Sequence, residues 1–213
     1  MEKGLQYLVL CPGSRSGPLA VAAGLLAESY DLKLITSIDE RSAAFLGLGI
    51  STATGKAAAV VTTSGSAVGN LLPAAIESDR SCQPLIFITA DRPERLKNCG
   101  ANQTVNQEEF LIPVCRWVEQ CPTKGFHLCS SLDLENLANR VWEKCHQFPG
   151  PVHCNIPFEE PLHASLEEQK VVWNNWFPQS FKRKKRLITS KKTEVEILSS
   201  DLSLLDPLSP GII

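Results

Sequence analysis

Two arginines and one glutamate stand in short polar segments, and each of these segments directly follows an apolar run. They are Arg15, Glu40 and Arg92. A planar guanidinium matches the two oxygens of a carboxylate or phosphate. A carboxylate at the start of a helix can relay a proton or accept a strong hydrogen bond. These residue types therefore indicate a pocket for an acidic substrate with one group that handles protons.

The neighbours of Glu40 support two interpretations. Asp39 is a good N-cap, and Glu40 falls in the first helical turn, where the helix dipole favours any surface acid. The stretch Ala43–Gly49 is small and apolar on nearly every side, which predicts a buried helix. A carboxylate at the mouth of a buried helix is poorly solvated and suits a proton relay. Local sequence alone leaves both interpretations open.

Arg15 also has two interpretations. The flanking Ser14 and Ser16 can cap a helix, and Pro18 suits its first turn, so these residues have a structural explanation. Arg15 does not, because a cation at a helix N-terminus is disfavoured. An anionic partner would explain it, since the planar guanidinium matches a carboxylate or phosphate, but the local sequence leaves open whether Arg15 binds a ligand.

Two further segments carry polar groups after apolar runs. Thr63–Ser66 opens a helix, and its backbone N–H groups could hold an anion. It lacks the second glycine and the Lys-Ser/Thr pair of a P-loop, and the chain has no G-x-G-x-x-G. Asn102 and Gln103 follow Arg92 in a polar stretch. With the arginines they resemble a pocket for a substrate with more than one carboxylate.

The elements that position these residues alternate between strand and helix. Apolar, β-branched runs are followed by helix-like stretches, and several runs are apolar on both faces, as covered strands are. This predicts an α/β fold with a doubly wound, mainly parallel sheet of about six strands and helices on both faces. Strands are expected at Tyr7–Cys11, Leu32–Ile38, Ala57–Thr62, Pro84–Ala90, Cys115–Gln120 and Val152–Ile156, and helices at Ser16–Ser29, Asp39–Thr54, Ser66–Ser78 and Ser131–Gln147. Ligands of such sheets bind beyond the carboxyl ends of the strands, where the polar segments fall.

Composition excludes several classes of function. The net charge of -2 gives no support for binding to nucleic acid or to an anionic membrane surface, and no apolar run is long enough to span a membrane. The N-terminus lacks a targeting pattern, so we expect a cytoplasmic protein. Eight cysteines without a Cys-x-x-Cys pair are expected to be free, mostly buried thiols, and no metal site is predicted. No histidine stands in the polar loops, so a Ser-His-Asp or Cys-His mechanism has no support.

Five motifs, in order and at matching spacing, carry a resemblance to a known family. They are Cys11–Ser16, Asp39–Ala43, Thr63–Asn70, Thr89–Pro93 and Cys99–Thr104. Over about residues 5–165 the chain resembles the N-terminal domain of the 2-succinyl-5-enolpyruvyl-6-hydroxy-3-cyclohexene-1-carboxylate (SEPHCHC) synthase family. The Ser-Arg-Ser and Asn-Gln motifs separate this family from acetolactate synthases and oxoacid decarboxylases. Gly17 and Ser66 depart slightly, since the family often has threonine there.

The resemblance implies a cofactor, substrates and site residues. The family depends on thiamine diphosphate and Mg²⁺ or Mn²⁺, and it joins the succinyl unit of 2-oxoglutarate to isochorismate in menaquinone and phylloquinone biosynthesis. Glu40 would be catalytic, through a hydrogen bond to N1′ of the cofactor's aminopyrimidine. The cofactor side would comprise Glu40, Thr63, Ser64, Gly65 and Asn70, and the substrate side Ser14, Arg15, Arg92, Asn102 and Gln103.

The resemblance also implies that half of the site lies elsewhere. The family holds the diphosphate and metal through a Gly-Asp-Gly motif in a C-terminal domain of the partner subunit, and this sequence has no Gly-Asp-Gly. We therefore expect a homo-oligomer with shared sites, and no activity from these residues alone. Residues 1–165 would form the pyrimidine-binding domain. Residues 166–213, with the basic run Lys182–Arg186, a helix at Thr193–Leu205 and a turn at Ser209–Ile213, would form a linker and the cut start of a central domain.

Two other functions stay open at this point. One is a different thiamine-dependent carboligase or decarboxylase with a similar pocket. The other is a non-catalytic, flavodoxin-like binding module, since this fold serves many functions.

Overall fold

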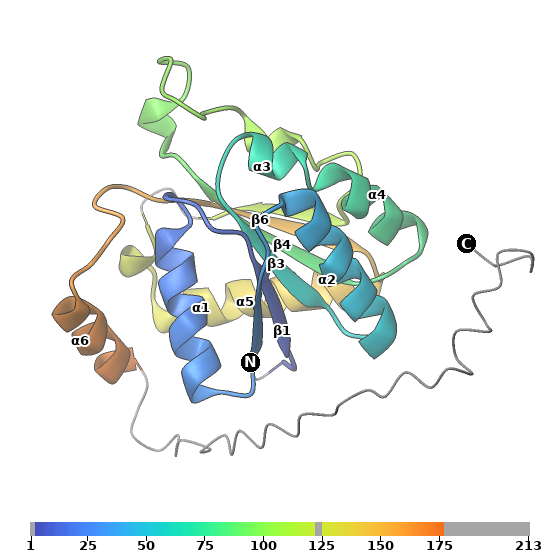
Figure 1. Cartoon of the computed structure of the whole chain (residues 1–213), viewed down its shortest axis with the longest axis horizontal. Helices are drawn as coiled ribbons and strands as arrows, with labels where there is room; N and C mark the ends of the chain where they lie inside the picture. The colour runs from blue at the N-terminus through green and yellow to red at the C-terminus, as the bar shows by residue number, and fades with distance from the viewer. Residues whose placement is uncertain (1–2, 122–124, 177–213) are drawn as a thin grey trace, which may run out of the picture. The chain divides into compact units, whose positions relative to one another are not determined.

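The computed structural model describes residues 3–121 and 125–176, and their core is one six-stranded sheet (Figure 1). The strand order is β2-β1-β3-β4-β6-β5, and all neighbouring strands are parallel. The strands are β1 (Tyr7–Leu10), β2 (Lys33–Thr36), β3 (Ala58–Thr62), β4 (Leu85–Asp91), β5 (Trp117–Gln120) and β6 (Pro151–Pro157). The predicted doubly wound, parallel sheet is therefore confirmed.

Helices cover both faces of the sheet. Those described are α1 (Gly17–Ser29), α2 (Glu40–Thr54), α3 (Ser66–Gly69), α4 (Leu72–Arg80), α5 (Ser131–Gln147) and α6 (Leu166–Trp176). In Figure 1, α2 and α4 lie on one face and α1 and α5 on the other. Short 3₁₀ turns occupy Glu94–Leu96, Gln107–Glu109 and Phe126–Leu128.

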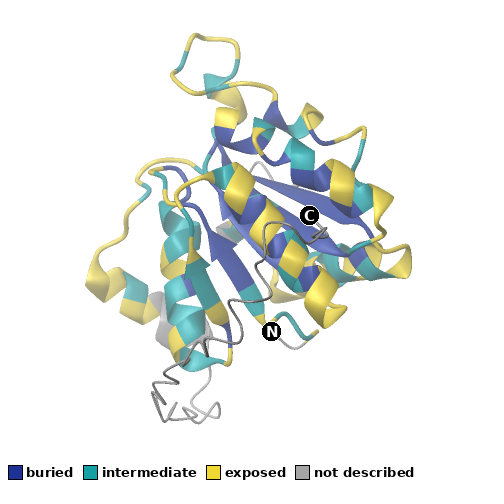
Figure 2. Cartoon of the chain, turned by 45° about the vertical axis from the view of Figure 1, so that its right-hand side comes forward, coloured by how far each residue is buried: buried dark blue, intermediate teal, exposed yellow. Residues whose placement is uncertain are grey.

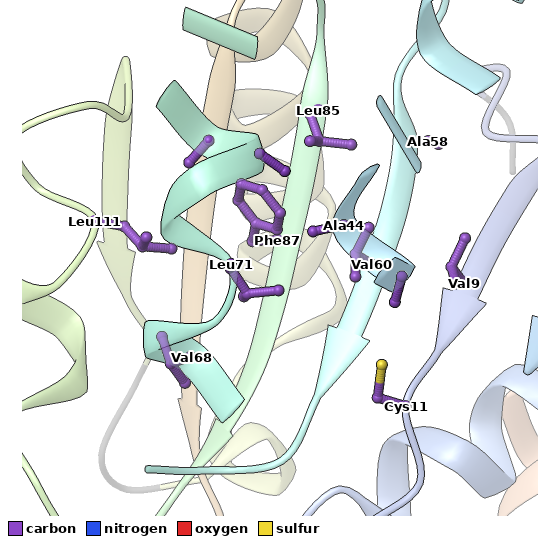
Figure 3. Close-up of a cluster of buried hydrophobic side chains, with 13 residues drawn as sticks. Val9, Cys11, Ala44, Ala58, Val60, Val68, Leu71, Leu85, Phe87 and Leu111 are labelled. Atoms are coloured by element: carbon purple, nitrogen blue, oxygen red, sulfur yellow. The ribbon is translucent and has the colours of Figure 1, made fainter. Parts of the chain in front are cut away.

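The core has two layers because successive strand side chains point to opposite faces. Val9, Val60 and Phe87 pack under α2 and α4, and Figure 3 shows their side chains in one row across three strands. Leu8 and Ile86 pack with residues of α1 and α5 on the other face. Figure 2 shows the sheet buried between the two helix layers. The strands are therefore apolar on both faces, as their sequences indicate.

The predicted helix at Ser66–Ser78 is two helices. Pro73 lacks an N–H, and its ring would collide with the carbonyl four residues earlier in a continuous helix. The chain turns instead: the Asn70 amide donates to the Ser66 carbonyl and the Leu71 amide to the Val68 carbonyl. α4 then begins with Pro73 in its first turn. The break leaves Asn70 at the end of α3, which matters for the site.

The helix α6 was not predicted from the sequence. Ser165 and Glu168 form a reciprocal cap at its start, with the Glu168 amide donating to the Ser165 hydroxyl and the Ser165 amide donating to the Glu168 carboxylate. The S-x-x-E spacing was visible in the sequence. The predictions for Lys182–Arg186, Thr193–Leu205 and Ser209–Ile213 lie outside the described residues. None of the helices in residues 3–121 and 125–176 is long and apolar enough to cross a membrane.

Candidate active site

The polar loops gather at the carboxyl edge of the sheet. Because β2, β1, β3 and β4 are spatial neighbours and all parallel, the loops that follow them lie side by side. Arg15 follows β1, Glu40 begins α2 after β2, Thr63–Gly65 follow β3 and Arg92 follows β4. The predicted convergence of four loops on one edge is confirmed.

Glu40 is placed by the capped start of α2. The Asp39 carboxylate accepts a hydrogen bond from the Ser42 amide at 2.7 Å, and hydrogen bonding to Ser42 lowers the pKa of Asp39. The half-buried Glu40 accepts one hydrogen bond on Oε2, from Asn70 Nδ2 at 3.3 Å. Its Oε1 has no hydrogen-bond partner among the described residues. One carboxylate oxygen is thus available to a ligand.

The prediction that α2 is buried on nearly every side is wrong. Ala43, Ala44, Gly47 and Ser51 face the sheet and are buried. Gly47 permits this close packing, since a Cβ there would come within 2.7 Å of a Val60 methyl group. The opposite face is exposed, with Phe45 at 39% and Leu46 at 41% exposure. Small apolar residues all around a helix therefore did not mean burial here.

Cys11 follows the last residue of β1, and its thiol interacts electrostatically with the Glu40 carboxylate. Burial and the negative charges of Glu40 and Asp39 raise the pKa of the Cys11 thiol to about 12. The thiol is therefore neutral at physiological pH and is a poor nucleophile. All eight cysteines are free, and Cys11, Cys121, Cys145 and Cys154 are buried.

Arg92 joins the loops that follow β3 and β4. Its Nη1 donates to Ser64 Oγ at 2.5 Å and to the Gln103 carbonyl at 2.8 Å. Gln103 donates in turn from Nε2 to the Ser64 carbonyl at 2.7 Å. Burial and the nearby Arg15 guanidinium lower the pKa of Arg92. The Nε and Nη2 groups of Arg92 have no hydrogen-bond partner within the part of the chain that the structure describes.

Arg15 is the second cation of the group, with a side chain only 7% exposed. Its Nη1 donates to the Phe158 carbonyl at 2.9 Å and its Nη2 to Glu160 Oε1 at 3.1 Å. Its Nε is buried and has no hydrogen-bond partner in residues 3–121 and 125–176. The Ser16 hydroxyl donates to the Gly13 carbonyl and caps no helical amide, so the predicted serine cap is wrong, whereas Pro18 lies in the first turn of α1 as expected.

Gln107 is a residue that the sequence analysis missed. Its side chain is fully buried, and its Oε1 accepts from the Gly65 amide at 2.7 Å. Its Nε2 donates to the Ala90 carbonyl at 2.9 Å and to Asn155 Oδ1 at 2.8 Å. One amide thus links the ends of β3, β4 and β6. Nothing in the local sequence distinguishes it from other loop glutamines.

Gly65, whose amide is bound by Gln107, has a backbone conformation that favours glycine. Its φ of 78° lies in the left-handed region, and a Cβ would come within 2.6 Å of Gln103 Cγ. Glycine at this position therefore lets the loop after β3 pass directly under the loop that carries Gln103.

Behind the loops lies a buried polar chain on β4 and β6. Thr89 Oγ1 is 2.7 Å from His153 Nε2 and donates to Asn155 Oδ1 at 2.9 Å. Asn155 Nδ2 donates to Asp91 Oδ2, and Asp91 Oδ1 accepts from the Arg92 amide at 2.7 Å. Burial raises the pKa of Asp91. These bonds fix the backbone from which Arg92 extends.

His153 makes stability depend on pH. Burial lowers its pKa from 6.5 to about 4, so the imidazole stays neutral in the fold while the unfolded chain takes up a proton below pH 6.5. Its contribution is complete above pH 6.5 and is lost as pH falls toward 4. We expect this group to lower the free energy of unfolding by about 2 kcal/mol between pH 7 and pH 5.

Urea unfolding at the two pH values measures this effect, with His153→Gln as the comparison. Glutamine retains a polar partner for Thr89 and does not titrate, so the variant should lose less stability between pH 7 and pH 5 than the wild type. Equal losses in the two proteins would contradict the assignment. The comparison also cancels the opposite contribution of Asp91, whose raised pKa favours the fold as pH falls.

The structure brings the predicted residues into two contact groups. Arg92, Ser64 and Gln103 contact one another, with Gly65 beneath Gln103 and Arg15 nearby, whereas Glu40 contacts Asn70. Thr63 packs against Gly13. The exposed Ser14 and Asn102 make no side-chain hydrogen bond to a described residue. No cluster of three metal-ligating side chains occurs in residues 3–121 and 125–176.

Two acidic residues, Glu159 and Glu160, also belong to this edge and were not predicted from the sequence. They follow β6 at the same edge of the sheet and pair with Arg95 and Arg15, respectively. The signal was available, since only Pro157 and Phe158 separate this acidic pair from the predicted strand Val152–Ile156.

Comparison with known proteins agrees with the geometry. Residues 1–110 match the family model described as "Thiamine pyrophosphate enzyme, N-terminal TPP binding domain". Three curated relatives are named 2-succinyl-5-enolpyruvyl-6-hydroxy-3-cyclohexene-1-carboxylate synthase. Those of Prochlorococcus marinus strains SARG and MIT 9313 are each 58% identical over 99% of this chain and 37% of their own length. That of Synechococcus sp. WH7803 is 60% identical over 83% of this chain and 31% of its own length.

The chain thus spans little more than a third of the length of these relatives. The family match covers the four strands whose loops carry the predicted site. Together with the parallel sheet and the loops at its carboxyl edge, it shows that the chain belongs to the thiamine pyrophosphate enzyme family, as an N-terminal TPP-binding domain.

Proposed function

We propose that this chain supplies the pyrimidine and substrate side of the active site of a SEPHCHC synthase. The whole protein would decarboxylate 2-oxoglutarate and add the succinyl unit to isochorismate, in menaquinone or phylloquinone biosynthesis. The names of the curated relatives support the reaction class. The arrangement of Arg15 and Arg92 supports the substrate class.

The observation that carries the proposal is the pair of neighbouring guanidiniums with unused donors. Arg15 Nε is buried without a partner, and Arg92 Nε and Nη2 have no hydrogen-bond partner among the described residues. Burial and the repulsion between the two cations both lower the pKa of Arg92. An anionic ligand would accept hydrogen bonds from the unused donors and would reduce the repulsion between the two cations. A carboxylate is suited to this because its two oxygens match two N–H groups of a guanidinium. Substrates with carboxylates are therefore favoured over neutral ones.

Glu40 suits the cofactor side of the site. Its free Oε1 lies at the start of a helix and its Oε2 is held by Asn70, so the carboxylate is oriented but has capacity for one more strong hydrogen bond. Thiamine diphosphate supplies the electron sink for the loss of carbon dioxide when it is bound. We propose that Glu40 holds the proton at N1′ of its aminopyrimidine. Thr63, Ser64 and Gly65 would line the same ring.

We propose further that the diphosphate and Mg²⁺ or Mn²⁺ are bound by another domain, from a second copy of the protein. Exposed apolar side chains just before α2, on α2 and on α4 support a subunit contact here: Ile38 is 86% exposed, and Phe45, Leu46 and Ile76 are about 40% exposed. Large exposed apolar groups on adjacent elements are typical of interfaces. Residues 1–165 would be the pyrimidine-binding domain and 166–213 a linker and the start of a central domain, in a cytoplasmic enzyme.

Substrate assays on the full-length protein test this proposal. We expect turnover with 2-oxoglutarate and isochorismate. Turnover of pyruvate pairs alone would indicate a different thiamine-dependent carboligase or decarboxylase, and no thiamine diphosphate binding would indicate a non-catalytic module.

The arginines provide a sharper test. Replacing Arg15 or Arg92 by Ala should raise the KM for a carboxylate substrate by about 10- to 100-fold, because each removes a charge-assisted hydrogen bond. The accompanying change in thermal stability, measured as the melting temperature, should be small by comparison. Arg95→Ala is the matched control, since Arg95 is exposed and pairs with Glu159 at the surface. Equal KM values for the Arg15, Arg92 and Arg95 variants would refute the substrate assignment.

A further inference from the structure

We propose that Glu160 competes with a substrate carboxylate for binding to Arg15. Its own carboxylate binds Arg15 until a ligand carboxylate displaces it. The inference rests on the proposed function, because it assumes that Arg15 faces a substrate carboxylate. It adds a residue that sets the affinity of the site and lies on the loop after β6, outside the four loops already assigned.

Arg15 is held by a fixed contact and an exchangeable one. The fixed contact is the hydrogen bond from Nη1 to the backbone carbonyl of Phe158, the residue that follows β6. Phe158 is itself held in place, because its amide donates to the Asp91 carbonyl. Nη2 donates to the Glu160 carboxylate at 3.1 Å. Glu160 is 68% exposed, whereas Arg15 is 7% exposed. Water can therefore solvate Glu160 fully once it leaves, but it cannot do the same for Arg15.

The contact leaves Arg15 incompletely satisfied. Nη2 and Nε lie on the same edge of a guanidinium, and a carboxylate that approaches along this edge can accept from both. Within the part of the chain that the structure describes, Glu160 accepts from Nη2 alone, and the buried Nε has no hydrogen-bond partner. A ligand carboxylate that accepts from Nη2 and Nε would replace one hydrogen bond with two. This difference favours the ligand over Glu160.

An anion is needed at this position at all times. If Glu160 left without a replacement, Arg15 would keep a nearly buried charge near the Arg92 guanidinium, which is unfavourable. The exchange is therefore one carboxylate for another. A dicarboxylate can bind Arg15 through one carboxylate and the unused donors of Arg92 through the other. A monocarboxylate that binds Arg15 has no second carboxylate for Arg92.

Glu159 offers a matched control. It is the neighbour of Glu160, it is also exposed, and it forms two hydrogen bonds to Arg95, at 2.7 and 3.2 Å. Arg95 is 62% exposed, and among the described residues it makes no hydrogen bond or ion pair to a residue proposed for the substrate. Both acids are near the charge of Arg15, which helps to lower the pKa of Glu159, but of the two only Glu160 accepts a hydrogen bond from Arg15.

The test compares Glu160→Gln with Glu159→Gln. In the full-length protein, Glu160→Gln should lower the KM for 2-oxoglutarate by about 2- to 5-fold, the equivalent of an exposed ion pair. Glu159→Gln should leave it unchanged. A KM that rises or stays constant in Glu160→Gln overturns the proposal, because Glu160 would then orient Arg15 instead of competing for it.

A binding measurement separates this inference from the proposed function. Succinate is titrated into the 213-residue chain, and the Arg15 side-chain Nε–H resonance is followed by NMR. We expect the Kd to fall by the same factor in Glu160→Gln and not in Glu159→Gln. If succinate binding tightens but 2-oxoglutarate is not turned over, the reaction assignment fails and the competitor stands. If binding does not tighten, the competitor fails whatever the reaction.

Discussion

Replacing Glu40 by Gln should slow the exchange of the C2 proton of bound thiamine diphosphate by about 10²- to 10⁴-fold, the range of a lost general acid–base group. Glutamine keeps the size of the side chain and can still contact Asn70, so the fold should be unaffected. It cannot exchange a proton with the cofactor ring as a carboxylate does. Proton exchange into deuterated solvent, followed by NMR in the full-length protein, measures the effect.

Glu77→Gln is the control for this experiment. Glu77 is an exposed acid on α4, and its side chain has no hydrogen bond to a described residue. Both variants should melt at the wild-type temperature, and only Glu40→Gln should slow exchange. Wild-type exchange in Glu40→Gln would remove Glu40 from the chemistry and restore the simpler interpretation of an acid at a helix N-terminus.

Replacing Gln107 by Met lowers the free energy of unfolding by about 2–5 kcal/mol, since each buried group left without a partner costs about 1–3 kcal/mol. The change preserves volume but removes hydrogen bonds to Gly65, Ala90 and Asn155. A typical domain is stable by only about 5–15 kcal/mol, so this is a large fraction. Urea unfolding of the chain provides the measurement.

Two comparisons sharpen this result. Gln6→Met changes the same atoms at an exposed position and should alter stability by less than about 0.5 kcal/mol. Amide hydrogen exchange at Gly65 should accelerate in Gln107→Met beyond the change at Val60, because the loop after β3 loses its anchor before the strand does. A loss of stability no greater than that of Gln6→Met would show that the link between the three strands is not important.

The local sequence correctly predicted elements that depend on residues close to one another in the chain. β3 is a fully buried run that ends in Val60, Val61 and Thr62, and Asp39 caps α2 through an amide three residues away. Local patterns failed where neighbours in space decide. Small residues on every side of α2 suggested full burial, but only the side with Gly47 meets the sheet. The serine before α1 bonds a carbonyl rather than a helical amide.

The site shows the same division. The parallel order of the strands follows from βα alternation, and this alternation alone predicts that Arg15, Glu40, Thr63–Gly65 and Arg92 share one edge. Glu160 could have been included, because the same rule applies to the end of β6. The importance of Gln107 could not be inferred, since its three partners are 17 to 48 residues away in sequence.

The sequence by itself determined the fold class, the edge of the sheet that carries the polar loops, and the motifs of Arg15, Glu40 and Arg92. These depend on periodicity and on residue types, which a linear chain displays directly. Only the tertiary structure decided which donors remain free and which anion occupies Arg15. Those properties arise from contacts across 143 to 145 residues, between Arg15 and the segment after β6, and hydrogen bonds over such separations have no local signature.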